Sequence, residues 1–106
     1  MAKYLVIATY SPEGIKGVIK HGGTARSDAV RNSIEKLGGT MESFYFAFGE
    51  ADAYVTVDLP DNVTAAAMSM AVSSTGLAAS RVVVLLSPAE VDAASQQQVS
   101  YTPPGK

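Results

Sequence analysis

Four segments of this chain have the hydrophobic pattern of β-strands, and some of them are apolar on both faces of the expected strand. These segments are residues 3–10, 41–48, 52–59 and 80–86. Successive side chains of a strand point to opposite faces of a sheet, so a sheet covered on one side should alternate apolar and polar residues. Residues 82–86 show no polar alternation, and residues 44–48 are all aromatic or apolar. The pattern therefore predicts a sheet that is buried on both of its faces.

The segment between the first two strands carries the signals of a helix that is interrupted near its middle. Residues 11–13 (Ser-Pro-Glu) supply a serine N-cap, a proline at the first helical position and an acid in the first turn. The helical spacing of apolar residues breaks at residues 21–23 (His-Gly-Gly) and then resumes, with Thr24 as its expected cap. The pattern predicts one broken helix or two short ones, ending at the glycines of residues 38–39.

Two further helices are expected in the second half of the chain. One begins at residues 60–62 (Pro-Asp-Asn), is rich in alanine and methionine, and ends at Gly76. Four of its residues share one face: Val63, Ala67, Met70 and Ala71. Residues 87–90 (Ser-Pro-Ala-Glu) form a capping box, which predicts a short helix that runs to about Ala94.

The order of these elements predicts one α+β domain. The order is βαββαβ, and right-handed crossovers then give a ferredoxin-like antiparallel four-stranded sheet with its helices on one face. The uncovered face should pack on the same face of a second copy as a dimeric α+β barrel, so we expect a homodimer or higher homo-oligomer. We assign residues 1–95 to this domain and residues 96–106 to a C-terminal proline-rich tail. Its prolines restrict the backbone and Val99 and Tyr101 are apolar, so we expect it to pack on a neighbouring subunit. The alternative is a frayed terminus without such a contact.

The composition excludes several classes of function. The net charge is −2 and no run of lysine or arginine is present, so the positive surface that nucleic-acid binding needs is missing. The chain has no cysteine and one histidine, which argues against thiolate metal sites, and we expect neither a metal nor another cofactor. No apolar stretch approaches the roughly 20 residues that a membrane-spanning helix needs, and no signal-peptide pattern is seen. We therefore expect a soluble, cytoplasmic protein with neither a membrane nor a nucleic-acid partner.

Several stretches of the sequence resemble the GYD-domain family. They are residues 4–10, 11–14 (SPEG), 21–23 (HGG), 44–49 (FYFAFG), 52–60 (DAYVTVDLP) and the Pro-Pro-Gly of the tail. The family is named for a Gly, Tyr, Asp element at the start of the third strand. Here Gly49 and Asp52 are present, but Ala51 stands in the position of the tyrosine. The resemblance implies the dimeric α+β barrel superfamily but no particular activity, because such barrels include monooxygenases, isomerases and plain binding or structural modules.

His21 and Asp52 are the candidate acid/base residues. His21 is the only histidine, and histidine is the side chain that titrates near neutrality when unperturbed. Backbone N–H groups beside it, at the start of the resumed helix, would suit an anion. The structural alternative is a helix C-terminal histidine followed by glycine stop signals. Asp52 lies beside a glycine-containing loop, where it would act as a general base or accept hydrogen bonds from the backbone.

Three tyrosines complete the candidate ligand-binding set formed with His21 and Asp52. They lie on or beside the expected strands and are Tyr10, Tyr45 and Tyr54. A phenol can line a cleft and hydrogen-bond a ligand, but it serves equally as a core or interface aromatic. Three cationic side chains near the helices, those of Lys16, Arg26 and Arg31, could form an additional anion site.

Two functional hypotheses remain open. The first is a non-enzymatic module, an oligomer that binds a small apolar or aromatic metabolite or simply packs shut. The second is a cofactor-free enzyme of isomerase or monooxygenase type that uses His21 or Asp52 as its acid/base in an apolar pocket. In either case the pocket should lie between the sheet and the broken helix, near Tyr10, His21 and Asp52.

Overall fold

Residues 1–105, the part of the chain that the computed structural model describes, form four strands and four helices. The strands are β1 (Ala2–Tyr10), β2 (Thr40–Phe46), β3 (Ala53–Leu59) and β4 (Ala78–Leu85). The helices are α1 (Pro12–His21), α2 (Gly23–Lys36), α3 (Asn62–Ser74) and α4 (Pro88–Ser95). The interrupted helix is thus two helices, α1 and α2. Lys106, the last residue of the expected tail, lies outside the described residues.

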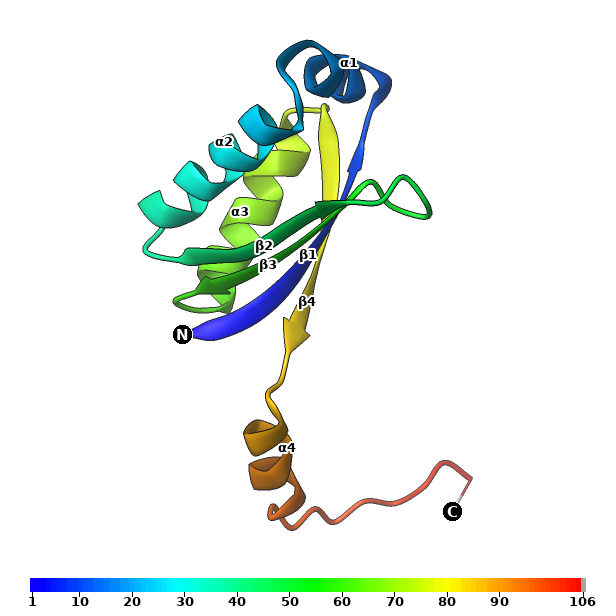
Figure 1. Cartoon of the computed structure of the whole chain (residues 1–106). Coiled ribbons are helices and arrows are strands. Elements are labelled where there is room, and N and C mark those ends of the chain that lie inside the picture. Colours follow the sequence, from blue (N-terminus) through cyan, green and yellow to red (C-terminus); the bar gives the residue numbers. More distant parts are fainter. Residues whose placement is uncertain (106) are drawn as a thin grey trace.

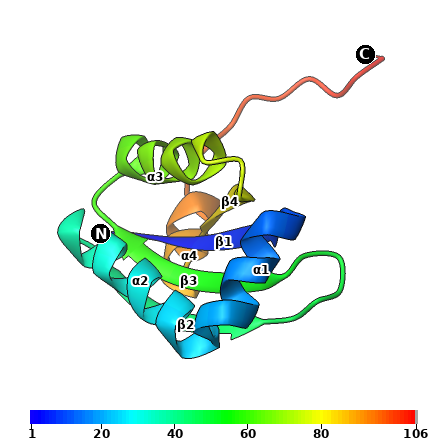
Figure 2. The ribbon, with the colours of Figure 1, turned by 90° about the horizontal axis from the view of Figure 1, so that it is seen from above.

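The strands form one antiparallel sheet in the order β2-β3-β1-β4 (Figure 1). This order, with a helical connection after β1 and another after β3, confirms the predicted α+β ferredoxin-like fold. Helix α2 packs against β2 and helix α3 against β4, and α1 lies beyond the end of β1 (Figures 1 and 2). One face of the sheet is therefore covered by helices.

Residue burial separates the two faces of the sheet. The odd-numbered residues of β3 are buried and the even-numbered residues are partly exposed, as expected for a strand with one face on a core. The core cluster on the helix side consists of Tyr4, Ile34, Met41, Val55, Val57, Leu59 and Ala65. The buried Tyr4 donates its hydroxyl to Asn62 Oδ1 at 2.6 Å, which satisfies its polar atom at the start of α3.

The opposite face, which we call the open face, carries an apolar strip. Strand pairing puts Ile7 and Tyr45 beside Tyr54, and Val83 beside Leu5, so these five side chains cross all four strands. Tyr45 is 71% exposed and Val83 is 42% exposed. The prediction that some strands are apolar on both faces is therefore confirmed, whereas the expected second covering layer is not part of the described chain.

One end of the open face is polar. Lys3 forms ion pairs with Glu42 and with Asp58, whose Oδ1 is 3.1 Å from Lys3 Nζ. Hydrogen bonds to these carboxylates, that to Glu42 foremost, raise the pKa of Lys3 above its ordinary value. In the next row the hydroxyls of Ser43 and Thr56 bond to each other. These groups border the apolar strip at one end, and the exposed Arg81 of β4, which pairs with Ile7, places a cation beside the strip.

Two local expectations were wrong, and one was confirmed. Strand β2 ends at Phe46 rather than at residue 48, because Phe48 adopts a φ of 57° and the chain turns into the following loop. Thr24 does not cap α2, since Gly22 precedes its first turn and no side chain makes the cap hydrogen bond. The predicted capping box of α4 is present: Ser87 Oγ accepts from the Glu90 N–H at 3.1 Å and Glu90 Oε1 accepts from the Ser87 N–H at 2.9 Å.

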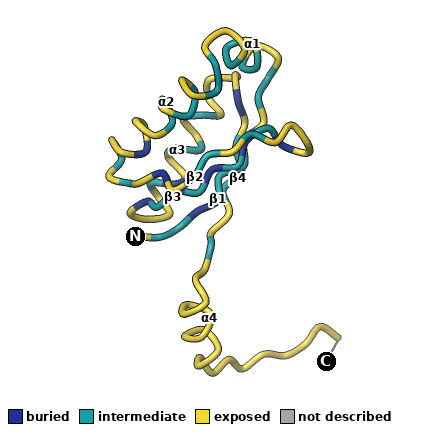
Figure 3. The backbone as a smooth tube through the Cα atoms, in the orientation of Figure 1, coloured by how far each residue is buried: buried dark blue, intermediate teal, exposed yellow. Residues whose placement is uncertain are grey.

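Residues 86–105, which we call the C-terminal arm, project away from the sheet and its helices (Figure 1). Every residue of the arm is exposed (Figure 3). Its larger apolar side chains are Leu86, Val91, Val99 and Tyr101. The radius of gyration is 16.8 Å, compared with about 13 Å for a compact domain of this length. The arm therefore lengthens the molecule but contributes no residue to the hydrophobic core.

Candidate functional site

A groove lies between α2 and α3 on the helix side of the sheet, with α1 at one end; we call it the helix groove. It encloses about 590 Å³. From α2 it is lined by Ala25, Ala29 and Ser33, whose four-residue spacing keeps them on one side of the helix, and from α3 by Met68 and Val72. Arg26 and Val30 also line it from α2. Because three of these five α2 residues have small side chains, the two helices leave space between them instead of closing over the sheet.

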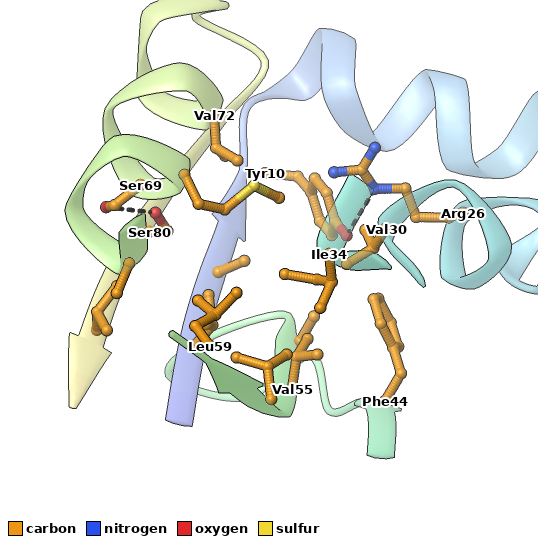
Figure 4. Close-up of a pocket in the computed structure, with 17 residues that line it drawn as sticks. Tyr10, Arg26, Val30, Ile34, Phe44, Val55, Leu59, Ser69, Val72 and Ser80 are labelled. Carbon is orange, nitrogen blue, oxygen red and sulfur yellow. Dashed lines mark hydrogen bonds between the residues drawn. The ribbon is translucent and has the colours of Figure 1, made fainter. Parts of the chain in front are cut away.

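A smaller cavity of about 50 Å³ lies beneath the groove, between the helices and the sheet (Figure 4). Most of its walls are apolar and come from the core side of the sheet. Residues that line both spaces form the floor of the groove and the roof of the cavity, and they are Tyr10, Arg26, Val30, Met68 and Val72. One layer of side chains therefore separates the groove from the cavity and the core.

The polar pair in this layer is Tyr10 and Arg26. Arg26 Nε donates to the Tyr10 hydroxyl at 3.3 Å, and the guanidinium carbon is 5.6 Å from the centre of the Tyr10 ring. Figure 4 shows the two side chains meeting at one end of the cavity. Among residues 1–105 no carboxylate lies within ion-pair distance of Arg26. The groove thus has the Arg26 cation at its floor beside apolar side chains, while Glu13 and His21 line it from α1.

Asp52 holds the end of β1 and does not line the groove or the cavity. Its Oδ2 accepts from the Tyr10 N–H at 2.8 Å, and its own N–H donates to the Ala8 carbonyl at 2.9 Å. Its carbonyl accepts from the Ala47 N–H at 2.9 Å, which closes the loop between β2 and β3. The sequence left two roles open for Asp52, a general base and an acceptor of backbone hydrogen bonds. The geometry agrees with the second role.

His21 is the last residue of α1 and lies exposed at the rim of the groove. The two glycines after it have structural roles of their own. Gly22 adopts a φ of 91°, and its N–H donates to the Val18 carbonyl at 2.7 Å, which ends α1. A Cβ on Gly23 would lie 3.0 Å from the ring of Phe46, so glycine lets α2 start directly above that ring. The helix break is therefore explained by backbone geometry and packing without a ligand.

A comparison of the chain with models of protein families finds a match. The model of the GYD domain matches residues 4–95. This chain belongs to the GYD domain family. The match confirms the resemblance seen in the sequence and spans every element of the fold from β1 to α4. No curated protein and no solved structure matches the chain.

At residue 51, where the resemblance in the sequence leads one to expect the family tyrosine, this GYD domain has a buried alanine. Ala51 is 1% exposed, and its carbonyl accepts from the Gly49 N–H at 3.1 Å within the loop between β2 and β3. A phenol ring does not fit a position packed around a methyl group unless the loop moves. The conformation of this loop is therefore adapted to a small residue.

The candidate ligand-binding residues of this GYD domain are divided between two faces of the sheet. Tyr10 and His21 line the helix groove, whereas Tyr45 and Tyr54 are cross-strand neighbours on the open face. Asp52 joins the strands and lines neither pocket. The structure thus brings two of the five together on the groove, and a ligand role for any of them stays a prediction.

The three cationic residues do not gather into one anion pocket. Lys16 pairs with Glu13 and Arg31 pairs with Asp28, each at 3.3 Å on the exposed surface. Arg26 alone of the three lines the groove.

The sequence pattern does not mark the apolar floor of the groove. Met68 and Val72 line it from α3, whose sequence is apolar on several sides, so no periodic pattern distinguishes them. The signal that could have found the groove is the run of small residues at 25, 29 and 33 on a helix that faces another helix.

Within residues 1–105, no helix combines the length and the apolar character that crossing a bilayer would require. The same residues contain no cluster of three histidine or acidic side chains placed to bind a metal ion. The cytoplasmic location stays a prediction.

Proposed function

We propose that this GYD domain is a homo-oligomeric binding module whose helix groove takes up a small apolar or aromatic metabolite. The observation that carries the proposal is the groove itself, whose floor is an apolar layer of side chains with one tyrosine and one arginine. Ligand pockets typically enclose about 300–1,000 Å³ and combine apolar walls with a few placed polar groups. At about 590 Å³, with Met68, Val72 and Val30 as apolar lining and Tyr10 and Arg26 as polar groups, the groove fits this description.

The cofactor-free enzyme has less support from the geometry. His21 and Asp52, its two candidate acid/base residues, do not share a cavity. The Asp52 carboxylate already accepts a hydrogen bond from the Tyr10 backbone, and His21 is exposed at the groove rim. An acid/base residue in an apolar, water-excluding pocket would need a more enclosed position than either has.

The open face supports the homo-oligomeric part of the proposal. Leu5, Ile7, Tyr54 and Val83 form a continuous strip that no helix of the described chain covers. Stacking two such faces would bury these side chains and leave the polar Lys3 end near the border of the interface. The C-terminal arm supports it independently, because its apolar residues are exposed in the single chain.

Binding to the groove can be tested with Nile red, a neutral apolar dye whose fluorescence rises in apolar surroundings. The wild type should bind it saturably, and Ala29→Phe should lose this binding, because the added ring fills the space between α2 and α3. Ala67→Phe is the matched control, since Ala67 is exposed on α3 and lines none of the described pockets. Equal dye binding by all three proteins would contradict the proposal.

A further inference from the structure

We infer that the helix groove selects molecules that carry a carboxylate beside an apolar or aromatic body, and that Arg26 binds the carboxylate. This inference rests on the proposed function, since it names the class of ligand that the same groove takes.

The geometry of Arg26 leaves most of its donors available. A guanidinium has five N–H donors, of which the Nε donor is used by the Tyr10 hydroxyl at 3.3 Å. The terminal nitrogens make no hydrogen bond to another residue of the described chain. Two parallel N–H donors of an arginine match the two oxygens of a carboxylate, and such paired bonds are among the stronger ones in proteins. The free donors of Arg26 lie at the groove floor, where a bound molecule would meet them.

The position of Arg26 is fixed by Tyr10. The guanidinium carbon is 5.6 Å from the Tyr10 ring centre, which is within the range of a cation–π contact, and the Nε bond adds a second constraint. Tyr10 is itself held by Asp52 through its backbone N–H. A side chain that is held in place before the ligand arrives loses little conformational entropy on binding. Arg26 should therefore bind an anion more tightly than an arginine that is free to move.

The charges around the groove favour an anion at its floor. Glu13 is the acidic residue among the groove lining, but its side chain is 70% exposed and pairs with Lys16 at 3.3 Å. His21, at the rim, is a further hydrogen-bond donor or acceptor on the α1 side. A neutral molecule that displaced water from Arg26 would leave this cation without a partner, which disfavours its binding. A carboxylate replaces the lost water with a charged partner.

The shape of the two spaces indicates where the apolar body lies. The cavity of about 50 Å³ is large enough for a water molecule or a small substituent but not for a six-membered ring. The groove of about 590 Å³ accommodates a ring with a short side chain between Ala29 on α2 and Val72 on α3. The ring of an aromatic acid would therefore lie in the groove, with its carboxylate on Arg26.

The test compares cinnamate with cinnamamide, its neutral counterpart of nearly the same shape, by competition with Nile red or by calorimetry. The wild type should bind cinnamate about tenfold more tightly than cinnamamide. Arg26→Gln should remove this preference and leave cinnamamide binding nearly unchanged. Arg31→Gln, a substitution of an exposed arginine on the same helix that pairs with Asp28, should keep the preference.

Each outcome separates the inference from the proposed function. Equal affinity of the wild type for the two compounds, or a preference that survives Arg26→Gln, would overturn the role of Arg26 while the groove stays a binding site. If neither compound nor Nile red binds, the proposed function fails, and the inference fails with it. If Arg26→Gln does not fold, Arg26→Lys retains the charge without the paired donors and should show a reduced but measurable preference.

Discussion

The carboxylate of Asp52 fixes the backbone of Tyr10, with 2.8 Å between Asp52 Oδ2 and the Tyr10 nitrogen. Tyr10 is the last residue of β1, and its hydroxyl accepts a hydrogen bond from Arg26 at the floor of the helix groove. The loop between β2 and β3 is thereby connected to the groove through Asp52 and Tyr10. A residue predicted as a candidate acid/base is thus part of the support of the groove.

Substitution of Asp52 should reveal this supporting role. Asp52→Ala leaves the partly buried Tyr10 N–H without its acceptor, and we expect the free energy of unfolding to fall by about 1–3 kcal/mol. Asp52→Asn keeps a side-chain oxygen that can accept the same bond and should lose less. Urea denaturation of the three proteins measures the difference. An unchanged unfolding free energy for Asp52→Ala would show that this bond contributes little.

Two glycines of α1 should respond in opposite ways to the same substitution. A Cβ on Gly14 would lie 2.0 Å from the Leu77 carbonyl oxygen, whereas a Cβ on Gly17 would meet nothing within 4 Å. Gly14→Ala should therefore lower stability by about 1–3 kcal/mol through overpacking. Gly17→Ala should raise it by about 0.5–1 kcal/mol, because alanine is the better helix former. Thermal unfolding of both variants checks this contrast, and equal shifts would mean that α1 does not sit closely on Leu77.

Charge on the open face should disrupt the proposed assembly. Val83 belongs to the open face, whereas Val84 pairs with Tyr4 and lies on the helix side of β4. Arg81 lies on the same face of β4, two residues before Val83, so a lysine rather than a carboxylate gives an unpaired charge there. Val83→Lys would bury this charge between two sheets, at a cost of several kcal/mol per interface, so it should yield monomers. Val84→Lys places the same charge at a neighbouring, 53% exposed position and should leave the oligomer intact. Sedimentation of these variants gives the answer, and a wild type that is monomeric at micromolar concentration would refute the assembly.

Removal of the end of the C-terminal arm should weaken the same assembly. A chain that ends at Gln98 lacks Val99 and Tyr101, which are 78% and 70% exposed. If these side chains pack on a neighbouring subunit, the truncation should lower both the oligomer fraction and the melting temperature at a given protein concentration. Unchanged assembly and melting would mean that the arm serves no contact between subunits.

Local signals in the sequence were sufficient to predict much of the fold. Ser87 and Glu90 are close in the chain, so their capping box could be recognised without knowledge of the rest of the structure. The strand order followed from the βαββαβ sequence of elements and the handedness of the crossovers. The GYD resemblance pointed to the same fold.

The groove could not be predicted because it depends on how two helices lie relative to each other. In α3 the sequence is apolar on several sides, so the shared face of Val63 and Met70 did not identify the buried side. These residues are 78% and 72% exposed, and Ala65 is the buried residue of this helix instead. The β-bulge between Met41 and Ser43 likewise sets which aromatic residues of β2 face the helices, and no local pattern marks it.

Ligand binding in the helix groove is tested most directly by a solution NMR titration of the methyl-labelled protein with cinnamate. The methyl resonances of Val30, Met68 and Val72, which line the helix groove, should shift saturably. The methyl resonances of Leu5 and Val83, on the open face, should remain in place. Shifts confined to Leu5 and Val83, or no saturable shift at any of these methyl groups, would contradict the claim that the helix groove is the binding site.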